Sequence, residues 1–161
     1  DETLKLIGEK GIWLSMQPLD SAVRATSSDE QKQKKYDVAA GTSRIYSAVK
    51  KYKLKLAWGT DLLFNPSANA KQTATIPLMG KWFTPFEVLK MITHDNGELL
   101  AFSGKRSPYR EGKLGVIETG AYADLILVDG NPLKDLKLME DYDKNFILII
   151  KDGKVIKNTI R

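Results

Sequence analysis

Helical spacing of apolar positions alternates with short apolar runs over the first 58 residues. Residues 2–10 predict a helix, because their apolar side chains recur at helical spacing and Gly11 is a typical helix stop. Residues 12–16 and 55–58 are apolar runs of strand length, and residues 28–52 between them predict a long helix. The predicted buried stripe of this helix consists of Val38, Ile45, Val49 and Tyr52. Such alternation of helix and strand is typical of a parallel sheet in an α/β fold.

The pattern then changes from a polar loop to helices and finally to strands. Residues 65–81 contain two prolines and several small residues and predict a loop. A helix is predicted from Thr84, with Pro85 in its first position, and a second helix over about residues 96–102. The remaining predicted elements are a strand at 123–128, a short helix within 132–141, and a hairpin of strands 146–151 and 154–157 across Asp152-Gly153.

Composition limits the size of the fold and the kinds of site it can hold. The chain has 161 residues, one histidine and no cysteine. It is long enough for an ordinary domain but too short for a complete eight-stranded α/β barrel of about 250 residues. Without cysteine it forms no disulfide or thiolate metal site, and one histidine excludes a multi-histidine site built from this chain alone. No apolar run approaches the ~20 residues that span a bilayer, so no membrane partner is expected.

The formal charge of +5 is concentrated in one segment. Residues 28–55 contain eight basic and three acidic residues. A nucleic-acid-binding patch and the solvated face of an outer helix are the two interpretations. Arginine is scarce and no glycine-rich or aromatic nucleic-acid motif accompanies the lysines, so we interpret the segment as a solvated helix and expect no nucleic-acid partner.

The sequence Trp58-Gly59-Thr60-Asp61 is the most informative short motif of the chain. An apolar strand ends there in a glycine turn, which is followed by a hydroxyl and a carboxylate. In parallel α/β folds the carboxyl ends of strands face the active site, and a carboxylate in that position is suited to a divalent cation. A turn or helix-capping aspartate is the alternative interpretation.

Three segments resemble the C-terminal signature of the amidohydrolase superfamily. The longest, LGVIETGAYADLILVDGNPL, spans residues 114–133, and the second, FILIIKDGKV, spans residues 146–155. Residues 84–89 and 98–100 occupy the place of the helix pair that follows the last barrel strand in this superfamily. The nearest branch is formed by the imidazolonepropionase-like and Xaa-Pro-dipeptidase-like amidohydrolases, and the resemblance covers essentially the whole chain.

This resemblance implies an α/β fold, consisting of the C-terminal part of a metal-dependent (β/α)8 barrel plus strands of the flanking β-sandwich domain. Residues 1–104 would hold the last helices and strands of the barrel, and residues 105–161 the C-terminal strands of the small β-sandwich. The chain begins at Asp1 rather than at a methionine, so we interpret it as a fragment, either a cloned piece or a processed product.

The resemblance also assigns the chemistry. Complete members bind one or two metal ions, usually zinc, through histidines, often a carboxylated lysine, and an aspartate from the eighth strand. By motif position this aspartate is Asp61, which becomes both a metal ligand and the catalytic group that accepts a proton from the attacking water. The His-x-His motif of the family has no counterpart here. Because a catalytic zinc site needs about three protein ligands, the isolated chain is expected to hold no metal and to be inactive. We interpret His94 as a surface or helix C-terminal histidine rather than as a replacement ligand.

The intact parent is expected to use a divalent metal, zinc, to hydrolyse the C–N bond of a small-molecule amide, cyclic amide or Xaa-Pro dipeptide. Residues 65–81, which follow Asp61, either shape the substrate pocket or form a plain surface loop. An alternative function from another class is a non-catalytic fragment or interaction module that oligomerises. Open sheet edges and 42% hydrophobic residues favour a homo-oligomer.

Overall fold

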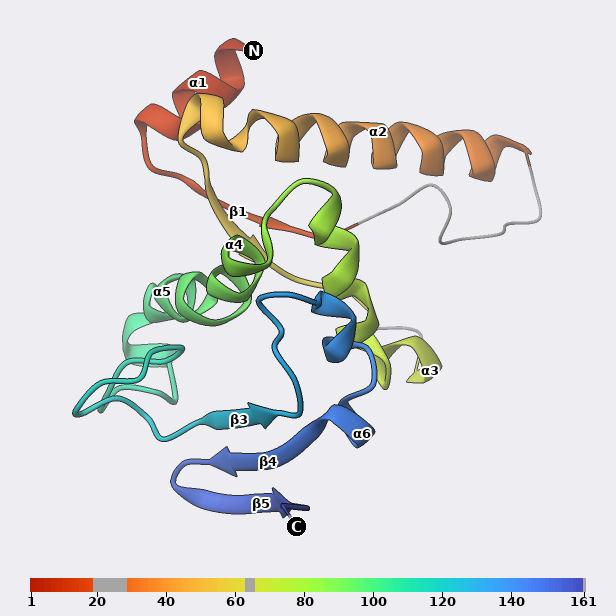
Figure 1. Cartoon of the computed structure of the whole chain (residues 1–161). Helices are drawn as coiled ribbons and strands as arrows, with labels where there is room; N and C mark the ends of the chain where they lie inside the picture. Colours follow the sequence, from red (N-terminus) through yellow and green to blue (C-terminus); the bar gives the residue numbers. More distant parts are fainter. Residues whose placement is uncertain (19–28, 63–65, 161) are drawn as a thin grey trace. The chain divides into compact units, whose positions relative to one another are not determined.

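The computed structural model describes residues 1–18, 29–62 and 66–160 of the chain. The chain forms two compact units, residues 1–61 and residues 62–161 (Figure 1). The first unit contains a parallel pair of strands with two helices, and the second contains a helical region and an antiparallel sheet.

The first unit runs α1 (Glu2–Glu9), β1 (Trp13–Met16), α2 (Asp29–Tyr52) and β2 (Lys55–Trp58). Gly11 ends the first helical segment with a φ of +61°, a conformation that glycine adopts without steric cost. β1 and β2 pair in parallel, in a register that runs from Trp13 opposite Lys55 to Met16 opposite Trp58. The predicted parallel pairing is therefore confirmed.

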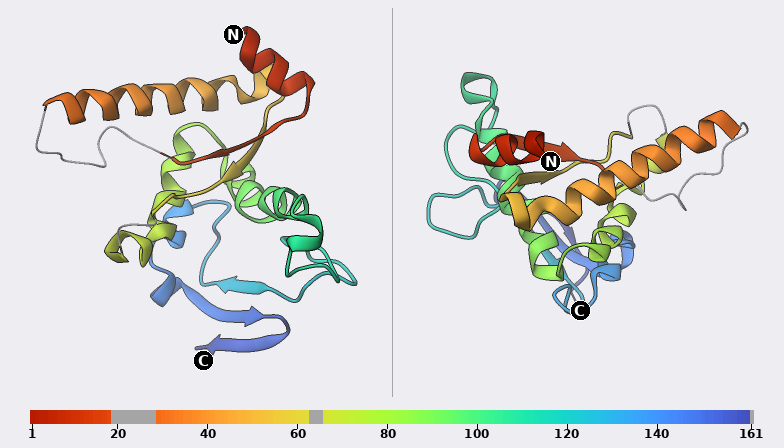
Figure 2. Two further views of the ribbon diagram at one scale, coloured as in Figure 1. Left: turned by 180° about the vertical axis from the view of Figure 1, so that it is seen from behind. Right: turned by 90° about the horizontal axis from the view of Figure 1, so that it is seen from above.

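The buried stripe of the long helix α2 differs from the predicted one. Val38 is 46% exposed, whereas Thr42 and Tyr46 are buried, at 5% and 3%. Thr42 tolerates burial because its hydroxyl donates a hydrogen bond to the Val38 carbonyl oxygen at 3.1 Å. The prediction was wrong at Val38 because it considered apolar side chains alone, whereas the buried positions of this helix include the polar Thr42. In Figure 2, α2 is the long orange helix beside α1.

In the second unit, residues 66–69 and 72–81 are helical, where a polar loop was predicted. They form α3 (Pro66–Asn69) and the 3₁₀ helix η2 (Gln72–Lys81). Pro77 lies inside η2 without breaking it, because the φ that proline imposes falls within the 3₁₀ range. Ile76 and Met79 are buried three residues apart, which matches the three-residue period of this helix. Residue 65 of the predicted loop lies outside the described residues.

The predicted helix pair is one uninterrupted helical run of three elements. α4 (Pro85–Lys90) continues through a π-helical turn, η3 (Met91–Asp95), into α5 (Asn96–Ala101). Its start was predicted correctly, since Thr84 and Glu87 form a reciprocal capping box with Pro85 in the first turn. The second helix, predicted over about residues 96–102, corresponds to α5, although no break separates it from η3. Gly97 packs closely against a later segment: a Cβ on it would lie 2.5 Å from the Leu114 carbonyl oxygen. A short 3₁₀ turn, η4 (Gly104–Arg106), follows.

The C-terminal strands form a three-stranded antiparallel sheet in the order β3 (Leu125–Val128), β4 (Phe146–Lys151), β5 (Lys154–Asn158). Asp152 and Gly153 both have positive φ, +50° and +72°, as the predicted tight hairpin requires. β3 and β5 are the edge strands of this sheet as the structure describes it, and they lie on either side of β4 in Figure 1.

Asp124 ties the start of β3 to this hairpin. Its carboxylate accepts hydrogen bonds from Lys151 Nζ at 2.5 Å and from the Asp152 backbone N–H at 2.7 Å. The hydrogen bond from Lys151 is the main cause that holds the pKa of the Asp124 carboxyl below its usual value. Asp124 is therefore a structural residue of the sheet.

Two short helices connect β3 with β4, where one was predicted. Asp135 and Asp141 accept backbone hydrogen bonds at the starts of η5 (Leu136–Met139) and α6 (Tyr142–Asn145). η5 packs against η2, and α6 contacts β4. The buried apolar core of this unit comprises Ile76, Met79, Phe83, Val88, Met91, Leu136, Met139 and Phe146.

The boundary between the two compact units does not coincide with the predicted domain boundary. The first compact unit of the structure ends at residue 61. The division into 1–104 and 105–161 concerns the barrel and β-sandwich regions of a longer fold, and it stays a prediction.

Candidate functional site

Asp61 lies just beyond the carboxyl end of the parallel strand pair. The Gly59 backbone N–H donates to the Met16 carbonyl oxygen at 3.1 Å, so hydrogen bonding between the two chain segments continues one residue past β2. The chain then turns at Asp61, whose φ of +52° is in the left-handed region. Aspartate is among the few residues other than glycine that adopt this conformation with any frequency. The motif thus places a carboxylate at the edge of a parallel sheet where the sequence predicted it.

The glycine of this motif lies close to the neighbouring strand. A Cβ on Gly59 would be 3.3 Å from the Ser15 Oγ, tighter than ordinary van der Waals contact. A larger residue there would displace Ser15 or the turn. Gly59 therefore lets β2 end beside β1 and leads the chain into the turn that presents Asp61.

The Asp61 carboxylate is suited to bind a cation but supplies only one ligand. Asp61 is exposed, and it makes no hydrogen bond or ion pair with the residues that the structure describes. Among those residues, the acidic and imidazole groups gathered closely enough to share an ion are His94, Asp95 and Glu98, and Asp61 is not one of them. Asp61 is therefore suited to be one oxygen ligand of a metal ion. The other ligands of a catalytic metal site would have to come from residues other than those that the structure describes.

His94 was predicted to be a surface or a helix C-terminal histidine; its side chain is 38% exposed, and the helical run continues past it. It lies inside the helical run, in the π turn η3, where its Nδ1 is 2.8 Å from the Asp95 Oδ1. Its Nε2 faces the Glu98 Oε1 at 3.9 Å, one helical turn further along the chain. The helix C-terminal alternative assumed that the helix ends at this point, whereas the run continues to Ala101.

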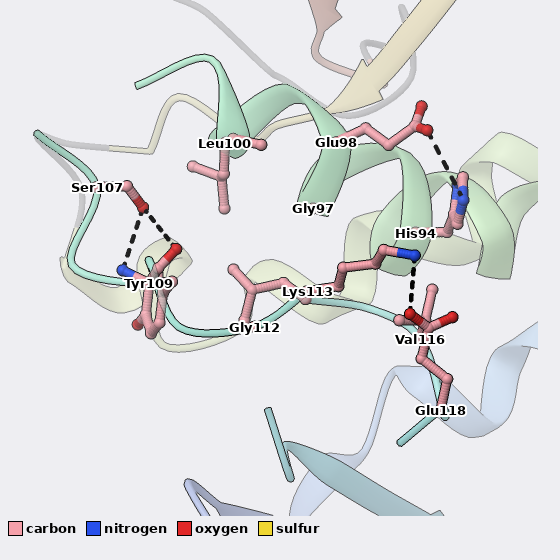
Figure 3. Close-up of a pocket in the computed structure, with 12 residues that line it drawn as sticks. His94, Gly97, Glu98, Leu100, Ser107, Tyr109, Gly112, Lys113, Val116 and Glu118 are labelled. Carbon is pink, nitrogen blue, oxygen red and sulfur yellow. Dashed lines mark hydrogen bonds and ion pairs between the residues drawn. The ribbon is translucent and has the colours of Figure 1, made fainter. Parts of the chain in front are cut away.

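A cavity of about 340 Å³ lies beside this histidine (Figure 3). One wall is formed by the helical run and the other by the segment that follows η4. Lys113 and Glu118 cross that second wall as an ion pair with an Nζ–Oε1 distance of 2.8 Å, and the side-chain hydrogen bond to Glu118 raises the pKa of the Lys113 ammonium. The lining residues are His94, Gly97, Glu98, Leu100, Ala101, Ser107, Tyr109, Gly112, Lys113, Leu114, Val116 and Glu118.

This cavity was missed in the sequence because its walls meet only in the tertiary structure. Gly97 and Gly115 form the contact: a Cβ on Gly115 would lie 2.3 Å from the Thr93 carbonyl group. The two glycines were the only sequence feature that could have indicated this contact. Glycine is also common in turns, however, and its position in the sequence does not show which backbone segment it will approach.

Among the helices of the described residues, none is long and apolar enough to cross a membrane.

Comparison with known proteins identifies the source of this arrangement. The sequence profile of the amidohydrolase family matches residues 1–157. A solved amidohydrolase structure is 28% identical over 100% of this chain, with a TM-score of 0.81. A prolidase in complex with N-methylphosphonate-L-proline is 24% identical over 99% of the chain, with a TM-score of 0.79. At this level of identity the similarity establishes a shared fold and nothing more. The solved structure of an ochratoxinase from A. niger is 26% identical over 98% of the chain, with a TM-score of 0.70. No protein of curated function matches.

The chain accounts for only part of these structures. It covers 38% of the amidohydrolase, 38% of the prolidase and 35% of the ochratoxinase. The parallel strand pair and the C-terminal antiparallel sheet are therefore a partial α/β barrel with flanking strands. Members of the family are generally metal-dependent hydrolases. Because the family profile matches all but the last few residues of the chain, the chain belongs to the amidohydrolase family.

Proposed function

We propose that this chain is the C-terminal part of a metal-dependent amidohydrolase that cleaves the C–N bond of an amide, a cyclic amide or an Xaa-Pro dipeptide. The observation that carries the proposal is the exposed carboxylate of Asp61, presented just beyond the carboxyl end of a parallel strand pair. In barrels of this class the reactive groups lie at that edge. Residues 1–104 are proposed as the barrel part and residues 105–161 as the β-sandwich part.

Asp61 has two roles in this proposal. In its first role, the Asp61 carboxylate is one oxygen ligand of a divalent ion, for which we propose zinc. In its second role, an Oδ atom of the same carboxylate accepts a proton from the attacking water. The ion, when bound, supplies a Lewis acid and a water of lowered pKa. Because Asp61 makes no ion pair with the described residues, its negative charge is available for both tasks.

The length of the chain leads to the expectation that it is inactive alone. A catalytic zinc site needs about three protein ligands, and Asp61 is one. The substrate panel consists of Xaa-Pro dipeptides, amides, cyclic amides and ochratoxin, the last because an ochratoxinase is among the similar structures.

The test compares the purified 161-residue chain with a polypeptide in which the coding sequence upstream of Asp1 is included. We expect zinc-dependent hydrolysis of at least one panel substrate by the longer protein and none by the chain alone. A chelator should abolish the activity, and added zinc should restore it. Hydrolysis by the isolated chain that survives the chelator would contradict the proposal.

A second candidate function is an interaction module that oligomerises, and the exposed sheet favours it. Apolar side chains on both edge strands are solvent-accessible: Ile126 on β3 is 53% exposed, and Ile156 on β5 is 65% exposed. Edge strands with unpaired backbone groups and apolar side chains favour pairing with another chain.

Light scattering on the isolated chain tests this candidate. We expect a homodimer or larger oligomer, shifted towards monomer by Ile156→Lys, because a charge on an edge strand opposes strand pairing. Lys154→Arg, on the same strand, is the matched control and should leave the mass unchanged. A monomer that melts cooperatively would rule out the module.

A further inference from the structure

We propose that His94 and Glu98 bind a divalent transition-metal ion at the edge of the 340 Å³ cavity, with Asp95 as a positioning residue. This site lies in the second unit and uses none of the residues of the proposed hydrolase site. It is therefore independent of whether Asp61 serves in catalysis.

The composition of the chain makes His94 the natural anchor for such an ion. The chain has one histidine and no cysteine, so His94 supplies its single imidazole and there is no thiolate. Imidazole suits zinc, copper and nickel, whereas isolated carboxylates suit harder cations. Any transition metal that is coordinated by an imidazole nitrogen of this chain must therefore be held by His94.

The hydrogen bonding of the ring leaves the correct nitrogen available. Asp95 Oδ1 lies 2.8 Å from His94 Nδ1, which assigns the Nδ1–H tautomer to the neutral ring and a lone pair to Nε2. A carboxylate on one ring nitrogen and a metal on the other is the common arrangement of metal-binding histidines. Lys90 forms an ion pair with the same Asp95 carboxylate, which holds Asp95 in this supporting place.

The second ligand is already close to the open nitrogen. His94 Nε2 and Glu98 Oε1 are 3.9 Å apart. Two ligands of a tetrahedral ion with bonds of about 2.0–2.1 Å lie about 3.4 Å from each other, so closure needs a shift of about half an ångström. The Glu98 side chain is 55% exposed and is free to make this movement.

The three groups meet within the helical run: Glu98 lies four residues after His94, the spacing of neighbouring side chains on a helix, and Asp95 follows His94 directly. Adjacent residues of a regular α-helix point in different directions, yet His94 and Asp95 are hydrogen-bonded neighbours within η3. The ligand atoms of His94, Asp95 and Glu98 all lie within 4.8 Å of one another. π turns inside α-helices occur frequently at functional sites.

The cavity supplies the remaining coordination positions. His94 and Glu98 line it from the helical run, and the Lys113–Glu118 pair lines it from the facing segment, on the same side of the view as His94 (Figure 3). An ion with two protein ligands keeps open positions for water or for a small anionic ligand, and the cavity is where such a ligand would enter. The site thus has the open coordination of a ligand-binding metal centre rather than the closed set of a structural one.

The test is zinc titration of the tag-free 161-residue chain by calorimetry, together with the proton NMR signals of its one imidazole. We expect one zinc per chain and a shift of the His94 ring signals. His94→Ala and Glu98→Gln should each weaken the affinity at least tenfold, with His94→Gln as a second variant in case the alanine variant misfolds. Asp95→Asn should weaken it about tenfold, as loss of a partner behind a metal-binding histidine does.

Asp61→Asn is the control that separates this site from the proposed catalytic one. It should leave the zinc affinity unchanged. Unshifted imidazole signals at saturating zinc, equal affinity in His94→Ala, or loss of binding in Asp61→Asn would each overturn the proposal. Equal affinity in Asp95→Asn would overturn the positioning role of Asp95.

Discussion

Replacing Asp61 with asparagine is expected to lower kcat/KM of a complete amidohydrolase containing this chain by about 10²–10⁴-fold, the usual contribution of a positioned general base. The change removes the negative charge that would bind the ion and the oxygen that would accept the proton. Asparagine also adopts the left-handed conformation, so the φ of +52° at this position is preserved and the melting temperature should hardly change. Steady-state kinetics with the substrate found in the panel, together with zinc analysis of the purified variant, measures the effect.

Asp152 provides a matched control for this substitution. It is an exposed aspartate with a φ of +50°, but it lies in the β4–β5 hairpin turn. Asp152→Asn should therefore keep near-normal activity while making the same chemical change on the same backbone conformation. Equal losses in the two variants, or near-normal activity in Asp61→Asn, would show that Asp61 is a structural turn residue.

Gly115→Ala is expected to destabilise the chain by about 3 kcal/mol or more, because two costs add at this position. The φ of +72° strains any residue with a Cβ, by about 1–2 kcal/mol. The new methyl carbon would also lie 2.3 Å from the backbone carbonyl group of Thr93 and 2.7 Å from the backbone nitrogen of His94. Relief of that overlap requires the segment at Gly115 to move away from the helical run, and overpacking of this kind costs about 1–3 kcal/mol. Urea unfolding monitored by circular dichroism measures the difference.

Gly153→Ala is the control that measures the cost of the positive φ alone, without the steric overlap. Gly153 has the same φ of +72°, but a Cβ there would meet nothing within 4 Å. It should cost only the conformational strain of about 1–2 kcal/mol. If Gly115→Ala is no more destabilising than Gly153→Ala, the segment at Gly115 does not pack against the helical run in solution as it does in the structure. The Gly115 variant should also weaken zinc binding if the displaced segment disturbs His94.

Local patterns were sufficient where one short stretch of sequence carried both the element and its boundary. The apolar runs of β1 and β2 alternate with long helical patterns, and parallel pairing follows from that order. The capping box at Thr84 and the Asp152-Gly153 turn were also readable, since each depends on residues within one turn of chain. The order and spacing of the C-terminal motifs identified the family, which the match over residues 1–157 establishes.

The same local reasoning failed where a distant contact decided the conformation. Residues 72–81 look polar and contain Pro77, yet they form a helix because Ile76 and Met79 are buried and η2 packs on η5, more than 50 residues later. Gly97 lies within the helical run, and its lack of a side chain lets the segment at Leu114 approach, a contact that no local pattern indicated.

By itself, the sequence determined the family, the strand order of the first unit and the aspartate at the end of β2, because these depend on periodicity, turn chemistry and motif spacing. Only the tertiary structure decided that His94 lies within a π turn and lines a cavity. The reason is physical: a π turn is set by side-chain packing and by hydrogen bonds of a few residues, and no periodic pattern in the sequence marks it. A cavity likewise exists only once two chain segments have been brought together, here at Gly97 and Gly115, whose missing side chains permit the contact.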